Sequence, residues 1–479
     1  MSTEPLKQDS YDIAIIGAGP AGMSAAVTAC AAGASVVVLD DKPHAGGQIY
    51  RGVDHSPLET PDTLGEDYIK GQALTKAFAQ SGAEHLRGVN VWHVGDNGEV
   101  LLSEQGKTRR LTATQLIIAN GAMERPFPIP GWHLPGVMSA GSAQVMLKSD
   151  GLVIDDAVFV GTGPLLYLIV AQYIRLGVPV KAVVDTTPKE NYLNAAKVGL
   201  GAARMPKMLL KGLGLLREIR RAGVPFYRCA EALEVLGGEQ ATGIRFSAGG
   251  QHHEIEASRV FLHQGVIPNL NITRALGLEH HWCEQQLCWK PNLNVWGRSS
   301  LAHVAVVGDA SGIVGADGAH IMGRIAALMQ LESLGFIDKD QRNEQARAGF
   351  AQLDSMQRFR AFIDALYRPM DAHRIPQQDA TVVCRCEERS VADLKAGFAL
   401  GGKLPDQLKS QTRCGMGPCQ GRMCGHTVSE LLGQWNEQPV SEIGYYRLRS
   451  PMRLLTLEEL GAFSELAPSH ANAKPEVQS

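Results

Sequence analysis

The stretch Tyr11–Asp40 reads YDIAIIGAGPAGMSAAVTACAAGASVVVLD and decides the fold of the chain. A short apolar run leads into a glycine turn, the turn leads into an Ala-rich helix, and a second apolar run ends at Asp40. Strand, Gly-x-Gly-x-x-Gly turn, helix, strand and terminal acid together form the dinucleotide-binding fingerprint in its full context. The sequence therefore predicts an α/β chain that begins with a Rossmann-like domain.

The residues of this turn have separate tasks. A first glycine permits the tight turn, a second lets the backbone approach a pyrophosphate, and a third lets the helix pack closely on the strand. The helix then presents the positive end of its dipole to the phosphates, and the terminal acid can accept hydrogen bonds from a ribose. The cofactor-binding residues predicted here are Gly17, Ala18, Gly19, Pro20, Gly22 and Asp40.

Three later motifs resemble those that complete the FAD site in flavoproteins with two dinucleotide domains. They are the GGQ turn after the fingerprint, the end of the strand LIIANGA, and the GD pair in VAVVGDASG. In such flavoproteins the glycines bring the backbone close to the flavin, and the acid hydrogen-bonds the chain that carries it. The resemblance implies FAD in the first fold, bound also by Gly46, Gly47, Gln48, Gly121, Gly308 and Asp309.

A second glycine turn, GTGPLL, follows the apolar run AVFV and supplies Gly161 and Gly163. Leu166 stands at the third glycine position, which should push the helix slightly off the strand. Both a bound nucleotide and a retained but idle fold stay open here. If a nucleotide binds, the charge of Asp185 suits a free ribose hydroxyl and favours NAD over NADP.

Five of the nine cysteines lie near the C-terminus, at Cys384, Cys386, Cys414, Cys419 and Cys424. Thiolates bind zinc or iron–sulfur clusters. Zinc sites usually separate the first pair of ligands by two to four residues, whereas this pair is separated by one. Glycines around the last three cysteines leave room for a bulky inorganic core. The pattern favours an iron–sulfur cluster, with zinc and structural or redox thiols as the other interpretations.

The remaining cysteines suggest no chemistry. Cys283 and Cys288 lie in CEQQLC, and two cysteines without further ligands are more often small buried residues than a metal or redox pair. The CxxC or CxxxxC that disulfide reductases of this fold place against the flavin is missing. Thiol–disulfide exchange is therefore not an expected activity.

The phrase CRCEE followed by TRCGMGPCQGRMCG resembles the bacterioferritin-associated-ferredoxin-like (BFD-like) [2Fe-2S] domain. In particular it is similar to the version fused to the flavoprotein alpha subunits of opine oxidases, of D-hydroxyproline and L-proline dehydrogenase complexes, and to the B subunit of hydrogen cyanide synthase. The flavin motifs extend the likeness over most of the chain. It implies a [2Fe-2S] cluster bound by Cys384, Cys386, Cys419 and Cys424. Cys414 is left out because its position varies among related domains.

The resemblance also implies the architecture, with two nested Rossmann-like domains of glutathione-reductase type and a small helical BFD-like domain. The expected boundaries are 1–150 and 271–375 for a discontinuous FAD-binding domain, and 151–270 for an inserted NAD(P)-binding-like domain. The cluster domain is expected at 376–450 and a C-terminal tail at 451–479.

A chain with a flavin and a [2Fe-2S] cluster is suited to relaying electrons, and we find no acid, base or nucleophile pattern for a substrate. The resemblance implies an electron-transferring component that works with a smaller FAD-containing beta subunit, which oxidises an amine, and with a small ferredoxin-like gamma subunit. An adenine nucleotide in the second fold is compatible with it. The alternative is a self-contained NAD(P)H-dependent reductase. A third interpretation is a scaffold with inactive cofactor sites.

Composition sets the remaining limits. A chain of 479 residues is too long for one ordinary core, and a net charge of −3 without a basic block makes nucleic acid an unexpected partner. The N-terminal residues lack the basic and apolar regions of a secretory signal. We therefore expect a cytoplasmic protein, with peripheral attachment to the inner face of the membrane left open.

Overall fold

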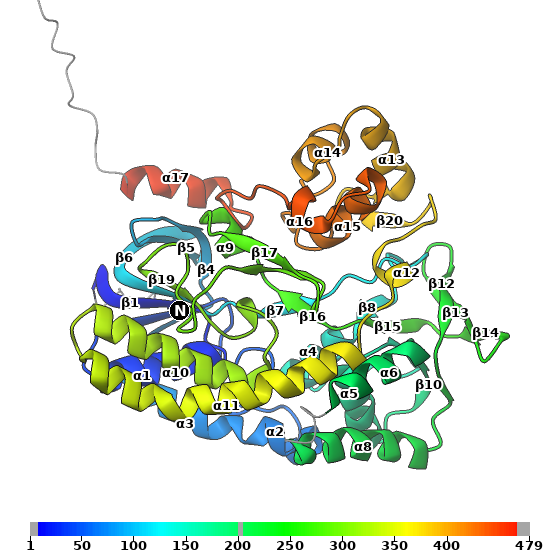
Figure 1. Cartoon of the computed structure of the whole chain (residues 1–479), viewed down its shortest axis with the longest axis horizontal. Coiled ribbons are helices and arrows are strands. Elements are labelled where there is room, and N and C mark those ends of the chain that lie inside the picture. Colours follow the sequence, from blue (N-terminus) through cyan, green and yellow to red (C-terminus); the bar gives the residue numbers. More distant parts are fainter. Residues whose placement is uncertain (1–7, 200–204, 467–479) are drawn as a thin grey trace, which may run out of the picture.

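The computed structural model describes residues 8–199 and 205–466 (Figure 1). The polar segment 467–479, the end of the predicted tail, lies outside the described residues. Two sheets lie side by side, helices cover them, and a smaller helical lobe lies above them (Figure 1). No helix within the described ranges combines the length and the apolarity needed to cross a bilayer.

The first sheet has the strand order β3-β2-β1-β6-β5-β4, with β19 also paired to β6. Its parallel strands are buried on both faces, which explains why the runs around the fingerprint are continuously apolar. Helices α1 and α10 pack together on one face. The elements are β1 (Ser10–Ile16), α1 (Pro20–Ala31), β2 (Val36–Asp40), β3 (Glu84–Arg87), β4 (Asn90–Val94), β5 (Glu99–Glu104), β6 (Lys107–Ile118), β19 (Val304–Val306) and α10 (Gly315–Ser333).

The second sheet is wholly parallel, in the order β11-β10-β9-β15-β8. Helices α4, α5 and α8 cover one face, and the antiparallel sheet β12-β13-β14 covers the other. The elements are β8 (Val137–Ser139), α4 (Ala140–Asp150), β9 (Ala157–Gly161), α5 (Pro164–Arg175), β10 (Val180–Asp185), α6 (Lys189–Lys197), α8 (Pro206–Arg221), β11 (Phe226–Tyr227), β12 (Glu231–Gly237), β13 (Ala241–Ala248), β14 (Gln251–Glu256) and β15 (Arg259–His263).

The chain returns to the first sheet through β19, which pairs with β6 in parallel register. The second sheet is therefore inserted into the first, and the predicted α/β fold with two nested Rossmann-like units is confirmed. Strand β8 pairs with β15, so the second sheet already takes up the chain before residue 151. Three residues are too few to show the alternation that marks a strand in sequence.

Shorter elements connect these sheets or lie at their edges. The hairpin β17–β18 and the pair β7–β16 are two-stranded antiparallel units. Their bounds and those of the neighbouring helices are η1 (Pro61–Leu64), α2 (Glu66–Ile69), α3 (Gly71–Ala79), β7 (Ala122–Glu124), β16 (Val266–Pro268), α9 (Asn271–Ala275), β17 (His280–Cys283), β18 (Cys288–Pro291) and η2 (Gly308–Ala310).

The long helix α11 leads out of the first sheet's helix layer toward the small lobe, and the chain then comes back (Figure 1). The lobe has its own core, built from residues 383–448. After it, α17 packs against β6. The elements are α11 (Lys339–Leu366), α12 (Asp371–Arg374), β20 (Val382–Cys384), β21 (Arg389–Ser390), α13 (Val391–Ala399), α14 (Pro405–Thr412), α15 (Gly425–Asn436), α16 (Val440–Ile443) and α17 (Leu457–Leu466).

Candidate functional site

The glycine turn between β1 and α1 has room for backbone only. A Cβ at Gly17 would collide with Ala119 O, and a Cβ at Gly22 would collide with Gly17 O. Gly17 also has a φ of +109°, which L side chains rarely adopt. Gly19 faces the next glycine turn, since its Cβ would lie 3.8 Å from Gly47 Cα. These features keep the N-terminus of α1 open to a pyrophosphate.

Two of the three later glycine motifs close around the same helix start. Gly46 N donates to Ala18 O at 2.8 Å, and a Cβ at Gly47 would lie 2.9 Å from Gly19 Cα. Gly308, with a φ of +64°, would place a Cβ 3.0 Å from Ala21 Cβ on α1. Motifs about 260 residues apart in the chain thus line one backbone-walled cradle. The cradle fits a long dinucleotide such as FAD.

Two acids predicted to bind the cofactor hold the loops of this cradle. The Asp40 carboxylate accepts hydrogen bonds from the N–H groups of Ala18 and Lys42, and its burial raises its pKa. Asp309 Oδ1 accepts from Val314 N and Gly315 N at 2.8 and 3.0 Å and so fixes the start of α10. Carboxylate oxygens each carry two lone pairs, so both acids retain capacity for ribose or ribityl hydroxyls.

Asn120 lies just after the end of β6, next to Gly121. Asn120 Nδ2 donates to Asn269 O at 3.1 Å, and Asn269 N donates to Gly121 O at 3.1 Å. Within the described residues, the buried Asn120 Oδ1 has no hydrogen-bond donor. A buried unpaired oxygen is costly, so a polar ligand group is a fitting partner for it.

Lys148 on α4 belongs to the site although no sequence motif pointed to it. Its side chain is only 3% exposed. Lys148 Nζ donates to Ile49 O at 2.9 Å, to Gln48 O at 3.2 Å and to Gln144 Oε1 at 3.2 Å. These hydrogen bonds therefore hold the backbone of the GGQ turn in place. Burial lowers the pKa of Lys148 from 10.5 to about 7.

This lysine should make folding stability depend on pH. Above pH 7 the folded chain loses the Lys148 proton, whereas the unfolded chain keeps it up to about pH 10.5, so stability rises with pH in that window. Between pH 7 and pH 9 we expect the free energy of unfolding of the wild type, measured with a chemical denaturant, to rise by about 2 kcal/mol more than that of Lys148→Met. Lys76→Met, on the exposed side of α3, is the matched control and should follow the wild type. If the free energy of unfolding depended on pH in the same way for the wild type and for Lys148→Met, the effect would be refuted.

The second glycine turn keeps the required geometry. Gly161 has a φ of +137°, and its Cβ would collide with His263 O. Gly163 faces the His263 ring, whose Nδ1 lies 2.5 Å from Glu124 Oε1. Leu166 is fully buried in the core of the second sheet, so the fold accommodates the missing third glycine.

Asp185, at the end of β10, is already bound by protein groups. Its carboxylate accepts from Thr187 N at 2.9 Å and from Thr187 Oγ1 at 2.6 Å, and it also hydrogen-bonds the Tyr167 hydroxyl. It is 3% exposed, and burial raises its pKa. The turn is thus intact, while the acid is largely engaged within the chain.

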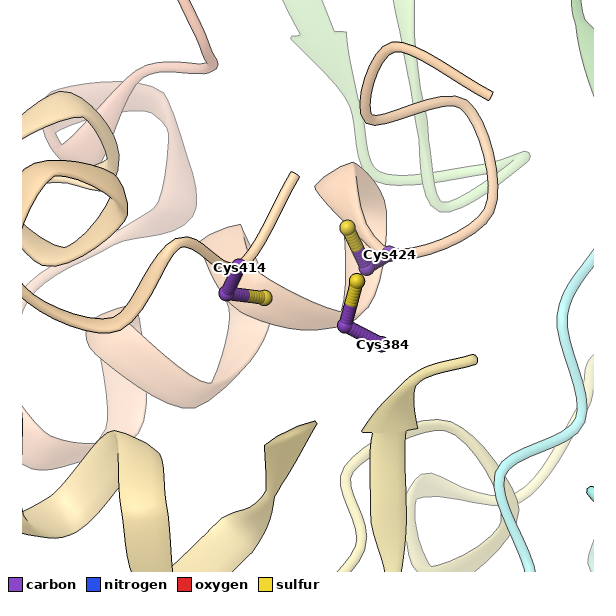
Figure 2. A group of neighbouring side chains, drawn as sticks. All are labelled: Cys384, Cys414 and Cys424. Atoms are coloured by element: carbon purple, nitrogen blue, oxygen red, sulfur yellow. The ribbon is translucent and has the colours of Figure 1, made fainter. Parts of the chain in front are cut away.

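Three of the five C-terminal cysteines meet in the small lobe (Figure 2). The Sγ atoms of Cys384, Cys414 and Cys424 all lie within 4.8 Å of one another, and all three residues are buried. Cys386 and Cys419 lie outside this group and hydrogen-bond each other. The structure thus brings two of the four predicted ligands together, and adds Cys414, which the sequence-based prediction leaves out.

The three thiols polarise one another. Cys414 and Cys424 donate hydrogen bonds to Cys384, which lowers the pKa of Cys384 and raises the pKa values of the other two. Cys424 is the N-cap of α15, where the helix dipole favours negative charge. Within this group the negative charge is therefore favoured on Cys384.

Glycines let the cysteine loop wrap around two tyrosines. A Cβ at Gly415 or Gly421 would lie 2.8 or 2.7 Å from the Tyr446 ring, and one at Gly425 would collide with Tyr445. The Tyr446 hydroxyl lies 3.5 Å from Cys414 Sγ. Three cysteines on this loop and two at and just after the end of β20 are a thiolate donor set that fits an iron–sulfur centre.

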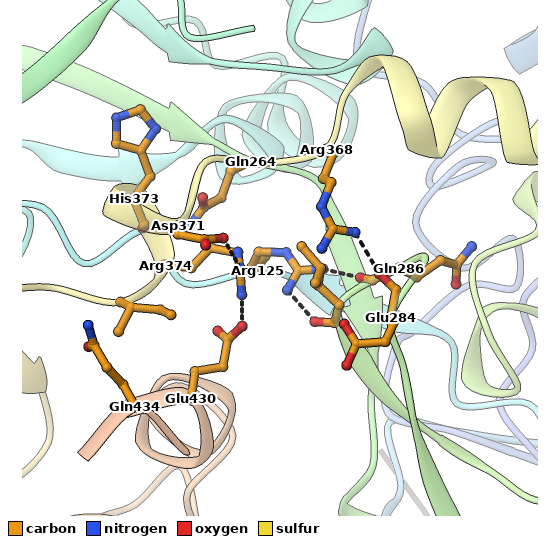
Figure 3. Close-up of polar contacts among 12 residues, drawn as sticks. Arg125, Gln264, Glu284, Gln286, Arg368, Asp371, His373, Arg374, Glu430 and Gln434 are labelled. Atoms are coloured by element: carbon orange, nitrogen blue, oxygen red, sulfur yellow. Dashed lines mark hydrogen bonds and ion pairs between the residues drawn. The ribbon is translucent and has the colours of Figure 1, made fainter. Parts of the chain in front are cut away.

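A buried ion pair fastens the small lobe to the rest of the chain (Figure 3). The Arg374 guanidinium on α12 pairs with the Glu430 carboxylate on α15, and their side chains are 5% and 4% exposed. Nearby, Gln264 Nε2 donates to His373 O at 3.1 Å, and Trp132 Nε1 donates to Val382 O at 2.6 Å. The lobe is therefore docked by the Arg374–Glu430 pair and by Trp132, while the bond from Gln264 holds α12 itself in place.

The hairpin β17–β18 spans the space between the flavin cradle and the lobe. Gln286 in its turn exchanges two hydrogen bonds with the backbone of Ile313, each 3.0 Å long, just after the Asp309 motif. At the other side, the Arg274 guanidinium lies between the rings of Trp289 and Tyr445, 4.7 and 5.3 Å from their centroids. The cradle and the cysteine loop are thus joined through one packed element.

Comparison with known proteins gives one family and several long matches. Residues 11–326 match the pyridine nucleotide-disulphide oxidoreductase family. The A subunit of opine oxidase from Agrobacterium tumefaciens is 40% identical over 463 residues, covering 94% of this chain and 92% of that protein. Hydrogen cyanide synthase subunit HcnB of Pseudomonas aeruginosa is 32% identical over 453 residues, covering 91% and 96%. The crystal structure of L-proline dehydrogenase from P. horikoshii shares the fold, with a TM-score of 0.67 at 18% identity, over 94% of this chain and 79% of that one.

Proposed function

Since this chain belongs to the pyridine nucleotide-disulphide oxidoreductase family, in the group of HcnB and the opine oxidase A subunits, we propose that it is the electron-transferring component of a heteromeric dehydrogenase. It is an FAD-dependent oxidoreductase subunit. The substrate we propose for the complex is an amino acid, an opine or a proline derivative, oxidised at its C–N bond. The observation that carries this proposal is the buried cysteine loop joined to an FAD fold through β17–β18.

The residues of the cradle bind and orient the cofactor. Gly17, Gly19 and Gly22 give the pyrophosphate access to the N-terminus of α1, and Asp40 and Asp309 receive hydroxyl groups. When bound, FAD accepts two electrons, and a [2Fe-2S] cluster carries one at a time.

For the cluster we propose Cys384, Cys386, Cys419 and Cys424 as ligands. Cys384 and Cys424 belong to the buried thiol group, and Cys424 lies at the N-terminus of α15, where the helix dipole favours a thiolate. The hydrogen bond between Cys386 and Cys419 supports the choice of these two as the remaining ligands. Cys414 then remains a buried neighbour whose sulfur lies near the Tyr446 hydroxyl.

Oxidation of the amine to an imine belongs, in this proposal, to a smaller FAD-containing beta subunit. Relatives of this chain are named as subunits of larger enzymes, so further subunits are part of the assembly. A ferredoxin-like gamma subunit can complete it. The described residues of this chain contribute binding, positioning and docking.

Anaerobic purification tests the proposal. We expect about one FAD, two iron and two sulfide per chain, and amine-dependent dye reduction only when the partner subunit is co-expressed. Zinc in place of iron and sulfide would overturn the cluster. Full amine oxidation by the isolated chain would overturn the subunit role.

The intact turn at Gly161 supports a second candidate, an NAD(P)H-dependent reductase. Stopped-flow mixing of the isolated holoprotein with NADH separates the two functions. We expect no rapid bleaching of the flavin, because Asp185 is engaged by Thr187 and Tyr167. Bleaching within milliseconds to seconds would instead favour the reductase.

A further inference from the structure

Cys283 and Cys288 lie directly opposite each other on the two strands of the hairpin β17–β18. Directly opposed residues of an antiparallel pair have Cα atoms about 4.5–5.5 Å apart and point to the same face of the sheet. Disulfides usually join Cα atoms about 4.4–6.8 Å apart. Both thiols are free in this structure.

The two thiols differ in access. Cys283 is partly exposed, whereas Cys288 is 0% exposed, and burial raises the pKa of Cys288 to about 11. The exposed partner can therefore meet a small reactant from solvent, and the buried one can react only with its neighbour. This asymmetry suits an exchange in two steps.

Among the four residues between the cysteines, Gln286 holds the loop after Asp309, and its neighbours hold the turn itself in place. Gln286 bonds both backbone groups of Ile313, and Gln285 Nε2 donates to Asp364 Oδ2 at 2.9 Å. Arg125 donates to Gln286 O and Leu287 O at 2.6 and 2.7 Å (Figure 3). The cysteine pair closes the base of this turn, so a bond between the two sulfurs would change the position of Gln286 and, through it, of the loop after Asp309.

We propose that Cys283 and Cys288 form a reversible cross-strand disulfide. Its formation shifts the loop after Asp309, the flavin loop, through the two hydrogen bonds between Gln286 and Ile313. The oxidant is a small-molecule disulfide. The Cys283 thiolate attacks one of its sulfurs and releases the first small thiol. Cys288, after losing its proton, attacks the Cys283 sulfur and releases the second thiol. Two protein thiols thus become one disulfide, and one small disulfide becomes two thiols.

The test treats the purified holoprotein, loaded with FAD and with the iron–sulfur centre that occupies the C-terminal cysteines, with oxidised glutathione. We expect two titratable thiols to disappear, a mass loss of about 2 Da on the peptides that carry the pair, and a shift in the visible flavin spectrum. Dithiothreitol should reverse all three changes. Cys229→Ser, which leaves the pair intact, is the control and should behave as the wild type.

Single variants identify the order of attack. Cys288→Ser should trap a stable glutathione adduct on Cys283 without the spectral shift, and Cys283→Ser should acquire no adduct at Cys288. Absence of a Cys283–Cys288 linked peptide in the oxidised wild type would overturn the disulfide. A linked peptide with an unchanged flavin spectrum would overturn its coupling to the loop.

Discussion

Replacing Cys424 by serine should remove the iron–sulfur centre from the chain. Cys424 is fully buried, it caps α15, and its sulfur is within 4.8 Å of those of Cys384 and Cys414. A cluster needs four thiolates, and a serine hydroxyl does not replace one at neutral pH. We expect iron to fall from about two per chain to near zero. Electron flow from the amine to an acceptor should fall more than about 100-fold, since even an outer-shell partner of a metal is worth 10- to 100-fold.

The matched control is Cys414→Ser, in the same buried group. Because Cys414 is outside the proposed ligand set, this variant should retain iron, sulfide and visible absorption. Two further single variants, Cys386→Ser and Cys419→Ser, complete the series, and each should lose the iron–sulfur centre. If Cys414→Ser loses iron while either of these two retains it, the group in Figure 2 supplies the ligands and the proposed set is wrong.

Replacing Glu430 by glutamine should loosen the small lobe from the rest of the chain. The variant leaves the Arg374 guanidinium buried without its 4%-exposed partner, and only the exposed Asp371 carboxylate remains beside it. Burial already lowers the pKa of Arg374 to about 10, which shows how costly its charge is there. Breaking a buried pair costs about 3–5 kcal/mol, so unfolding should begin at markedly lower denaturant concentration.

Two further variants isolate the ion pair from the packing. Glu234→Gln removes one partner of the exposed pair with Arg245 and should cost less than about 1 kcal/mol. The double variant Arg374→Met with Glu430→Leu should recover most of the loss, because apolar residues of similar volume can replace a buried pair. A Glu430→Gln variant as stable as Glu234→Gln would show that the pair does not dock the lobe.

The sequence predicts well those parts of the fold that local patterns encode. The turn at Gly17 and the pair Gly308–Asp309 carry steric and capping requirements that only a few residues satisfy, so their spacing in the chain is informative. The nested order of the sheets followed from finding these motifs in sequence. The strand β8 was missed because its place depends on pairing with β15, more than 100 residues away.

The supporting residues of the site were beyond the reach of the sequence. Lys148 contacts Gln48 and Ile49, which lie 100 and 99 positions earlier in the chain. Nothing in the local sequence Lys148-Ser149-Asp150 indicates a buried amine. The opposition of Cys283 and Cys288 depends on strand register, which composition does not reveal. Arg374 and Glu430 look like ordinary surface charges until the lobe is folded against them.

The docking of α17 on the first sheet has a mechanical consequence. Thr108 Oγ1 donates to Glu459 O, and the Phe463 ring packs edge-on against Trp92 at 5.8 Å. Met452 N donates to Trp92 O at 2.9 Å just before this helix. The lobe with the cysteines is thus attached to the rest of the protein at both of its ends. After a single proteolytic nick before residue 382 the lobe would stay attached through α17, and after a second nick the Arg374–Glu430 pair and Trp132 would still hold it.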